Sequence, residues 1–470
     1  MPDSQPQQPS SPDSPGPGES PGSRDARAPQ SAAGSPPPSP APGPSPAPSP
    51  AAPPSTAPSP SALLLCGARL TDGRTVDVRL GEGRIEAVGT AGSLAAHGGR
   101  VDLSGHLLLP AAAEPHAHSD TALSALTEGP VPGDVQDVQR RATEAALLQL
   151  GHGATALRSH VRIGDVQGLD SLHAVLQARR SLRGLVDLSV VAVPRLLTGM
   201  AGADGMAMLR DAVRMGASVV GGCPDLDPDP TGYVEAVLGL AAEHGCAVDL
   251  HTDGGDPARL ARLAAAAGGL RPGVTIGPCG GLGRLPSDVA ARTAEQLAAA
   301  GVTVVCLPQG DCGGAGHGAR AGAAHAGVAD GGAVPVRLLR AAGVRVAAGS
   351  GALRDMANPV GRGDPLEAAY LLASRQGLRP EEAYGAVSSA ARAAMGLAEV
   401  RVEAGFPAEL LAVRGDTLAG ALSLAYSRVV VHRGRVVART SAVREYCDSA
   451  AAVALDLPRQ GRGKGGGVVS

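Results

Sequence analysis

The chain has 470 residues, a formal net charge of −3 and seven cysteines that form no C-x-x-C pair. Charges of both signs are spread along it, which excludes the basic surface of a protein that binds nucleic acid or anionic membranes. No apolar stretch reaches the ~18 residues of a membrane span, and scattered cysteines are typical of a reduced compartment. We therefore expect a cytoplasmic protein with neither nucleic acid nor membrane as a partner.

The first 60 residues differ in composition from the rest of the chain. They hold 21 of the 40 prolines, mixed with Ser, Ala, Gly and Gln, and almost no Leu, Ile, Val or Phe. Such a segment buries too little apolar surface to offset the conformational entropy lost on folding. We predict a disordered tail over residues 1–60 and a shorter C-terminal tail over residues 443–470, which contains "RQGRGKGGGVVS".

Two segments far apart in the chain have the pattern of short β-strands. Residues 61–108 contain "ALLLCGARL" and "TVDVRLGEGRIEAVG", and residues 399–442 contain "AELLAVRG" and "YSRVVVHRGRVVAR". Their apolar residues alternate or run together between Gly-containing turns. We expect the two segments to pair into one small β-sandwich domain.

Residues 109–398 have a different rhythm, in which apolar runs alternate with Ala- and Leu-rich helical stretches that often end in Gly. Continuous apolar runs are typical of strands buried on both faces. Eight such units predict a (β/α)₈ TIM-like barrel, with a doubly wound open sheet as the alternative. The predicted strands are Leu107–Ala113, Ala154–His160, Val186–Val193, Ser218–Gly222, Ala247–His251, Val274–Gly277, Val302–Leu307 and Val344–Ala348.

Histidines stand at the ends of several predicted barrel strands. His116 and His118 follow the first strand, His160 ends the second and His251 ends the fifth. Residues i and i+2 of a strand share a face, and barrel active sites lie at the carboxyl ends of the strands. The pattern therefore predicts a metal site; the alternative is a pair of surface histidines in a loop.

Several stretches carry a family resemblance in their order along the chain. These are "PHAHSD", "RSHV", "DLHTDGGD", "NPVGRGDPLEAAYLL", "AVSSAARAAMGL" and "VEAGFPAELLAV". Together they resemble the amidohydrolase superfamily, most closely its cytosine deaminase-like branch, over roughly residues 62–440. The resemblance implies a barrel with one Fe²⁺ or Zn²⁺ ion, which activates a water for attack on a ring carbon bearing an amino or imino group.

The resemblance also implies the residues of the site. His116, His118 and His251 match its histidine ligands. It further implies a proton-shuttling Glu three residues after His251, a His after strand six, a His–Asp pair with a metal-bound Asp after strand eight, and a substrate-contacting Gln on strand three. At these four places the chain has Gly254, Pro278-Cys279, Ser350-Gly351 and Arg195.

Two functions remain open on these residues. The first is a hydrolase of non-peptide C–N bonds in a small heterocycle or cyclic amide. In it three histidines hold one Zn or Fe ion, Asp253, Asp256 or Asp355 replaces the general base, and Arg195 and His160 contact the substrate. Arg195 would favour an acidic substrate.

The second function is a catalytically inactive barrel that binds a ligand or a protein partner and needs no metal. The absence of a side chain at Gly254 and Gly351 favours this hypothesis. The sequence leaves open whether the chain forms a homo-oligomer.

Overall fold

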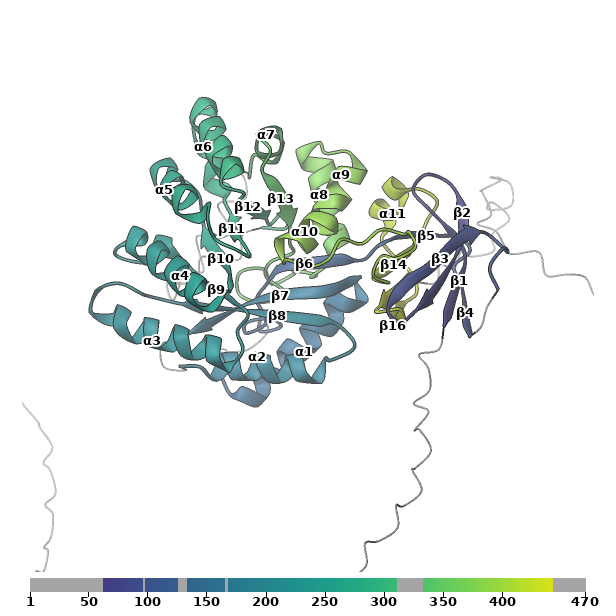
Figure 1. Cartoon of the computed structure of the whole chain (residues 1–470), viewed down its shortest axis with the longest axis horizontal. Helices are drawn as coiled ribbons and strands as arrows, with labels where there is room; N and C mark the ends of the chain where they lie inside the picture. Colours follow the sequence, from purple (N-terminus) through teal and green to yellow (C-terminus); the bar gives the residue numbers. More distant parts are fainter. Residues whose placement is uncertain (1–61, 96–97, 126–132, 165–167, 311–332, 443–470) are drawn as a thin grey trace, which may run out of the picture. The chain divides into compact units, whose positions relative to one another are not determined.

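The computed structural model of the chain describes residues 62–95, 98–125, 133–164, 168–310 and 333–442 (Figure 1). The tails predicted over residues 1–60 and 443–470 lie outside these residues. Within the described residues, no helix combines the length and the apolar character that crossing a membrane would require.

The central element is a sheet of eight parallel strands in sequential order (Figure 1). A backbone bridge between Ala117 and Gly351 links its first strand to the segment after its last strand and so closes the barrel. The predicted (β/α)₈ barrel is therefore confirmed. Its strands are β6 (Ala112–Ala117), β7 (Ala154–Ile163), β8 (Asp187–Pro194), β9 (Val219–Gly222), β10 (Ala247–Thr252), β11 (Val274–Pro278), β12 (Thr303–Cys306) and β13 (Arg345–Ala348).

Helices that follow the strands carry clear sequence signals at their ends. Three of them begin at an Asp–Pro pair, in which the Asp side chain accepts a backbone N–H of the first turn and the proline occupies the first helical position. Some helices end at a glycine in the left-handed conformation, such as Gly216 after α3 and Gly245 after α4. The helices are α1 (Val135–Gly151), α2 (Asp170–Ser181), α3 (Gly199–Met215), α4 (Pro230–His244), α5 (Pro257–Ala267), α6 (Ser287–Ala299), α7 (Val336–Ala341), α8 (Pro365–Gln376), α9 (Pro380–Val387), α10 (Ser389–Ala394) and α11 (Leu418–Leu424), with short 3₁₀ turns η2 (Pro224–Leu226) and η3 (Gly280–Arg284).

The second sheet joins the two ends of the described chain. Strand β14 pairs antiparallel with β5 and thereby connects the C-terminal strands to the N-terminal ones. The expected pairing of the two β-rich segments is confirmed, and the strands form one continuous mixed sheet. They are β1 (Leu63–Arg69), β2 (Thr75–Gly81), β3 (Arg84–Thr90), β4 (Gly99–Asp102), β5 (His106–Pro110), β14 (Leu410–Arg414), β15 (Arg428–His432) and β16 (Arg435–Thr440). The exact domain boundaries at residues 108/109 and 398/399 stay a prediction.

The predicted first barrel strand, Leu107–Ala113, is wrong in its bounds. Its first half is β5 of the small sheet, and its second half opens β6 of the barrel. Leu107 and Leu109 pack into the main core, whereas Leu108 packs into the core of the small sheet. Because β5 is buried on both faces, its residues have the same apolar character as a barrel strand, and the sequence pattern alone could not separate the two.

A buried ion pair connects the small sheet to the barrel helices. Arg428 of β15 donates to both carboxylate oxygens of Asp364, at 2.8 and 2.6 Å, and Asp364 caps the N-terminus of α8. The same guanidinium donates to the carbonyl of His152, which follows α1. This pair is bidentate and almost fully buried, a geometry in which both charges are satisfied.

Candidate metal centre

Three parallel strands bring four histidines to one mouth of the barrel. His116 lies in β6 with His118 directly after it, His160 lies in β7 and His251 lies in β10. The ring centroid of His116 lies 4.1 Å from that of His160 and 4.4 Å from that of His251. Since the strands are parallel, their carboxyl ends share one edge, so residues distant in sequence meet here.

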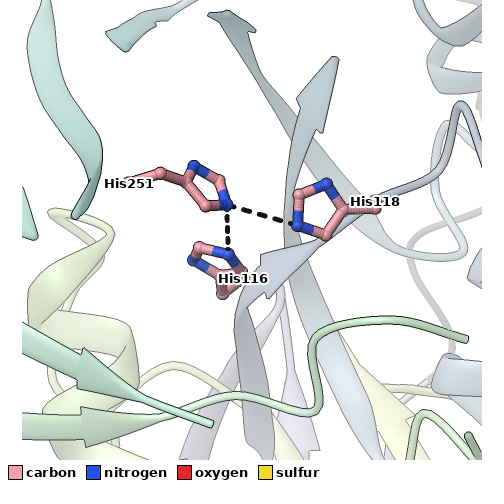
Figure 2. A group of neighbouring side chains, drawn as sticks. All are labelled: His116, His118 and His251. Carbon is pink, nitrogen blue, oxygen red and sulfur yellow. Dashed lines mark hydrogen bonds between the residues drawn. The ribbon is translucent and has the colours of Figure 1, made fainter. Parts of the chain in front are cut away.

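Three of these imidazoles point their Nε2 atoms toward one another. His116 Nε2 lies 2.8 Å from His251 Nε2, and His251 Nε2 lies 3.3 Å from His118 Nε2 (Figure 2). The potential ligand atoms of the three residues all lie within 4.8 Å of one another. The structure thus brings together the three histidines that the sequence proposed as ligands.

The spacing of these nitrogens fits a metal ion. Two imidazoles bound to one tetrahedral zinc ion have their nitrogens about 3.3 Å apart, because each Zn–N bond is about 2.0–2.1 Å. The observed separations of 2.8 and 3.3 Å are close to that value. A single proton on His251 Nε2 can serve one neighbouring nitrogen well, whereas a cation between the rings would accept all three lone pairs.

Burial keeps these imidazoles in the form that binds metals. Desolvation, helped by repulsion from the charged form of His118, lowers the pKa of His251 to about 3. Desolvation, helped by the nearby charge of Arg162, lowers the pKa of His118 to about 4. Desolvation, followed by the neighbouring histidines, lowers the pKa of His116 well below its usual range. All three are therefore neutral at pH 7, and neutral imidazole is the state that coordinates a cation.

A layer of buried polar residues lies below the histidines, and the sequence analysis missed it. Glu114, Arg158 and Asp249 each stand two positions before a clustered histidine on the same strand. Because strand residues repeat their facing every two positions, each points into the barrel beneath its histidine. This i−2 spacing from His116, His160 and His251 is the signal that could have identified them.

Glu114 joins β6 to the segment after β13. Its carboxylate accepts the backbone N–H of His116 at 3.0 Å, and the backbone N–H of Ser350 at 2.9 Å together with the Ser350 hydroxyl. Burial raises the pKa of Glu114 to about 7 although these donors oppose the rise. Gly349 makes the contact possible, because a Cβ there would lie 2.5 Å from Glu114 Oε1.

Arg158 and Asp249 form a fully buried ion pair inside the barrel. Arg158 Nη1 donates to Asp249 Oδ2 at 2.8 Å, and Arg158 Nη2 donates to the carbonyl of Ala394 at 3.0 Å. His160 Nε2 lies 3.2 Å from the other carboxylate oxygen, Asp249 Oδ1. Burial raises the pKa of Asp249, and Arg158 opposes that rise. His160, proposed from sequence as a substrate contact, is thus buried and in contact with this polar layer.

The three aspartates proposed as substitute bases lie outside the histidine cluster. Asp253 forms an ion pair with Arg284 at 2.5 Å, with about half of its side chain exposed. Asp256 accepts the N–H of Arg259 and caps α5. Asp355 accepts two backbone N–H groups and the hydroxyl of Thr121. None of the three belongs to the groups of potential ligand atoms within 4.8 Å found among the described residues.

Two arginines lie at the ends of neighbouring strands. Arg195 is exposed directly after β8. Arg162, in β7, has a largely exposed side chain and contacts Asp120 Oδ2 at 3.3 Å. Both therefore lie at the carboxyl side of the barrel, where a charged group of a ligand could meet them.

Two of the four places at which the resemblance implies further functional residues have a glycine in the left-handed backbone region. Gly254, after β10, has φ +71°, and Gly351, after β13, has φ +69°. A Cβ at Gly254 would lie 3.4 Å from Cys279, and one at Gly351 would lie 3.2 Å from Leu307 Cδ1. The backbone at both places is therefore suited to glycine.

Solved structures share the fold. The crystal structure of N-isopropylammelide isopropylaminohydrolase from Burkholderia multivorans is 27% identical, with a TM-score of 0.71, and the match covers 82% of this chain and 100% of that one. The structure of 5-methylcytosine deaminase from Klebsiella pneumoniae has a TM-score of 0.69 at 23% identity, covering 83% of this chain and 100% of that one, and supports the fold alone.

Sequence comparison points to the same group of proteins. Pterin deaminase of Rhizobium rhizogenes is 27% identical over 254 residues, covering 49% of this chain and 58% of that protein. N-isopropylammelide isopropyl amidohydrolase of a Pseudomonas species is 25% identical over 178 residues, covering 32% and 43%. The chain thus spans about half the length of the curated relatives it matches. The model of the amidohydrolase family matches residues 151–438, more than half of the chain. The chain belongs to the amidohydrolase family.

Proposed function

We propose that the protein hydrolyses a C–N bond in a small heterocycle or cyclic amide, with one divalent Zn or Fe ion held by His116, His118 and His251. The observation that carries this proposal is the convergence of three Nε2 atoms at the mouth of the barrel. The names of the sequence relatives support the substrate class, since they act on pterin and N-isopropylammelide. A bound divalent ion supplies Lewis-acid activation of water near neutral pH.

The chain's own residues prepare this site in two ways. Burial keeps the three imidazoles neutral, so that a cation displaces no protons when it binds. The contact of Glu114 with the backbone of His116 and with Ser350 holds β6 against the segment after β13, and so fixes where His116 points. Preorganised ligands of this kind raise metal affinity.

We further propose roles for the polar residues around the histidines. Asp253 and Asp256 lie near the carboxyl end of β10 and are the proposed proton acceptors, although their pairing with Arg284 and with the α5 backbone would have to loosen. Arg195 would contact an acidic group of the substrate from its exposed position after β8. His160 would position His116, since their ring centroids lie 4.1 Å apart with the rings tilted by 33°.

The test combines metal analysis with product release. Purified wild-type protein, expressed with added zinc or iron, would be analysed for metal and incubated with pterins, N-isopropylammelide, cytosines and small cyclic amides. We expect about one equivalent of metal, and ammonia or amine release that disappears in His116→Ala and His251→Ala. Metal below one-tenth of an equivalent together with no release from any substrate would refute the proposal.

For the proton acceptor, Asp253→Asn and Asp256→Asn would be compared in the same assay. Loss of a positioned general base lowers the rate by roughly 10²–10⁴-fold. If both variants keep the wild-type rate, neither carboxylate is the acceptor. Metal content measured in parallel separates loss of the base from loss of the ion.

One observation favours a second function, a barrel that binds a ligand without turnover. Gly254 and Gly351 have no side chain where the resemblance implies the proton shuttle and a metal-bound carboxylate. Calorimetric binding of a pterin or a cytosine without ammonia release would support this second function.

The cytoplasmic location is likewise a proposal, which the cysteine usage supports.

A further inference from the structure

Below the three-histidine cluster lies another set of potential ligand atoms. The side chains of His116, His160 and Asp249 are fully buried, and their potential ligand atoms all lie within 4.8 Å of one another. We propose that these three residues form a second divalent-cation position, deeper in the barrel, which shares His116 with the outer position formed by His116, His118 and His251.

The first argument is the state of the atoms that face each other. His160 Nε2 and Asp249 Oδ1 lie 3.2 Å apart, yet neither makes a hydrogen bond to a residue in the described part of the chain. Both atoms are buried away from bulk solvent. Buried polar atoms are normally satisfied, and a cation between this nitrogen and this oxygen would satisfy both.

The second argument is the type and spacing of the donors. Two imidazoles and one carboxylate form a common ligand set for Zn²⁺ and for non-haem Fe²⁺. With metal–nitrogen and metal–oxygen bonds of about 2.0–2.2 Å, neighbouring donors around one ion lie about 3 Å apart. The separation of 3.2 Å between His160 Nε2 and Asp249 Oδ1 agrees with that spacing.

The third argument is the way in which the carboxylate is held. Arg158 Nη1 donates a hydrogen bond to Asp249 Oδ2 at 2.8 Å. This bond orients the carboxylate and leaves its other oxygen, Oδ1, facing His160. Ligands fixed by such an outer partner bind metals more tightly than free ones. The guanidinium also withdraws part of the negative charge, so we expect the inner position to bind more weakly than the outer one.

Cobalt binding to full-length variants tests the inner position in the absence of the outer one. The double variant His118→Ala/His251→Ala lacks two outer ligands and retains all three inner ones. We expect it to bind one Co²⁺ in equilibrium dialysis, with an absorption spectrum of mixed nitrogen and oxygen ligation. Adding His160→Ala should weaken this binding at least tenfold, whereas adding His173→Ala, an exposed histidine on α2, should not change it.

The carboxylate is tested with its partner removed at the same time. Asp249→Asn combined with Arg158→Met avoids leaving a buried guanidinium unpaired, and in the double-variant background it should weaken Co²⁺ binding at least tenfold. Unchanged binding in either the His160→Ala or the Asp249→Asn/Arg158→Met background would overturn the proposal. The proposal would also be overturned if the His118→Ala/His251→Ala double variant bound no more Co²⁺ than a triple variant that also carries His116→Ala.

A measurement on the wild-type chain keeps the test valid if these variants do not fold. Crystals of the unmodified protein would be soaked in saturating CoCl₂, and anomalous scattering at the cobalt edge would locate each ion. A peak bounded by His116, His160 and Asp249 supports the proposal. A peak confined to His116, His118 and His251 overturns it while leaving the proposed function intact, and no peak at either position would count against both.

Discussion

Gly351 donates its backbone N–H to the carbonyl of His116 at 3.1 Å. The same segment forms the isolated bridge between Gly351 and Ala117, so the barrel closes at the strand that carries the paired histidines. The position at which the resemblance implies a metal-bound aspartate therefore supports His116 through its backbone. A side chain there would begin in the left-handed region and point toward Leu307.

Restoring the implied aspartate should therefore not rebuild a fourth ligand. Gly351→Asp places a charge against the apolar end of Leu307, whose Cδ1 would lie 3.2 Å from the new Cβ. We expect the free energy of unfolding to fall by about 1–3 kcal/mol, from backbone strain and burial of the charge, without a gain in metal affinity. Urea unfolding and cobalt titration measure the two effects.

A matched glycine separates strain from the general effect of adding a side chain. Gly239 lies in α4, is exposed and has no atom within 4 Å of an added Cβ. Gly239→Ala should stabilise the protein by about 0.5–1 kcal/mol, because alanine has the higher helix propensity. Tighter cobalt binding by Gly351→Asp than by the wild type would contradict the account of Gly351.

Removal of the metal should lower stability only in chains that keep the three ligand histidines. If a divalent ion binds the folded chain at His116, His118 and His251, an ion concentration 100 times Kd contributes about 2.7 kcal/mol to the free energy of unfolding. We expect EDTA to lower Tm and added zinc to restore it. In His116→Ala neither treatment should change Tm, whereas the exposed-site variant His173→Ala should respond like the wild type.

Asp227 should make stability depend on pH in the acid range. Its carboxylate accepts the N–H groups of Leu197 and Asp229, at 2.8 and 2.9 Å, and also bonds Thr198. Burial acts to raise the pKa of Asp227, but the Thr198 hydroxyl and the backbone donors outweigh it and hold the pKa below its ordinary value. A carboxyl whose pKa is lowered on folding contributes stability that is fully present above the unfolded pKa of about 4 and is lost as pH falls through the folded pKa.

The variant that tests this is Asp227→Asn. We expect its free energy of unfolding to fall by about 1–3 kcal/mol at pH 7, because three backbone N–H groups lose a charged acceptor. Between pH 7 and pH 3 the variant should lose less stability than the wild type. Urea unfolding at pH 7 and pH 3 gives both numbers. Asp211→Asn, in an exposed ion pair on α3, is the control and should change stability by less than about 0.5 kcal/mol. Parallel pH profiles of wild type and Asp227→Asn would rule out this role.

The buried Arg158–Asp249 pair should show strong coupling in a double-mutant cycle. Each single change, Arg158→Met or Asp249→Asn, leaves the partner charged or unsatisfied within the barrel, and should cost about 3–5 kcal/mol. The double variant should cost clearly less than the sum of the two. The exposed pair Arg292–Asp288 on α6 gives the comparison, with an expected coupling of about 0.3–0.5 kcal/mol. Additive costs for the buried pair would show that the two side chains do not act as a unit.

Local sequence patterns account for most of the fold. Asp–Pro pairs at residues 229–230, 256–257 and 364–365 begin three of the barrel helices, and the apolar runs predicted seven of the eight barrel strands close to their observed bounds. The exception was Leu107–Ala113, where β5 and β6 are continuous in apolar character but belong to different sheets. Periodicity reports how deeply a strand is buried, and two strands buried equally deeply look alike.

The candidate site was predictable only in part, and the reason is geometric. The H-x-H pair and the strand-end positions of His160 and His251 follow from two-residue periodicity and the parallel order of strands. The distances of 2.8 and 3.3 Å between Nε2 atoms cannot be derived from these patterns, because they depend on the tilt and closure of the whole barrel.

By itself, the sequence determined the strand and helix order, the histidines at the strand ends and the pairing of the two β-rich segments, because burial and periodicity are local properties of the chain. Only the tertiary structure decided that Glu114, Arg158 and Asp249 lie beneath those histidines with specific partners. It also decided that Asp253 and Asp256 are engaged in an ion pair and a helix cap. These contacts join residues up to 236 positions apart, and their geometry is set by barrel closure and not by any local pattern.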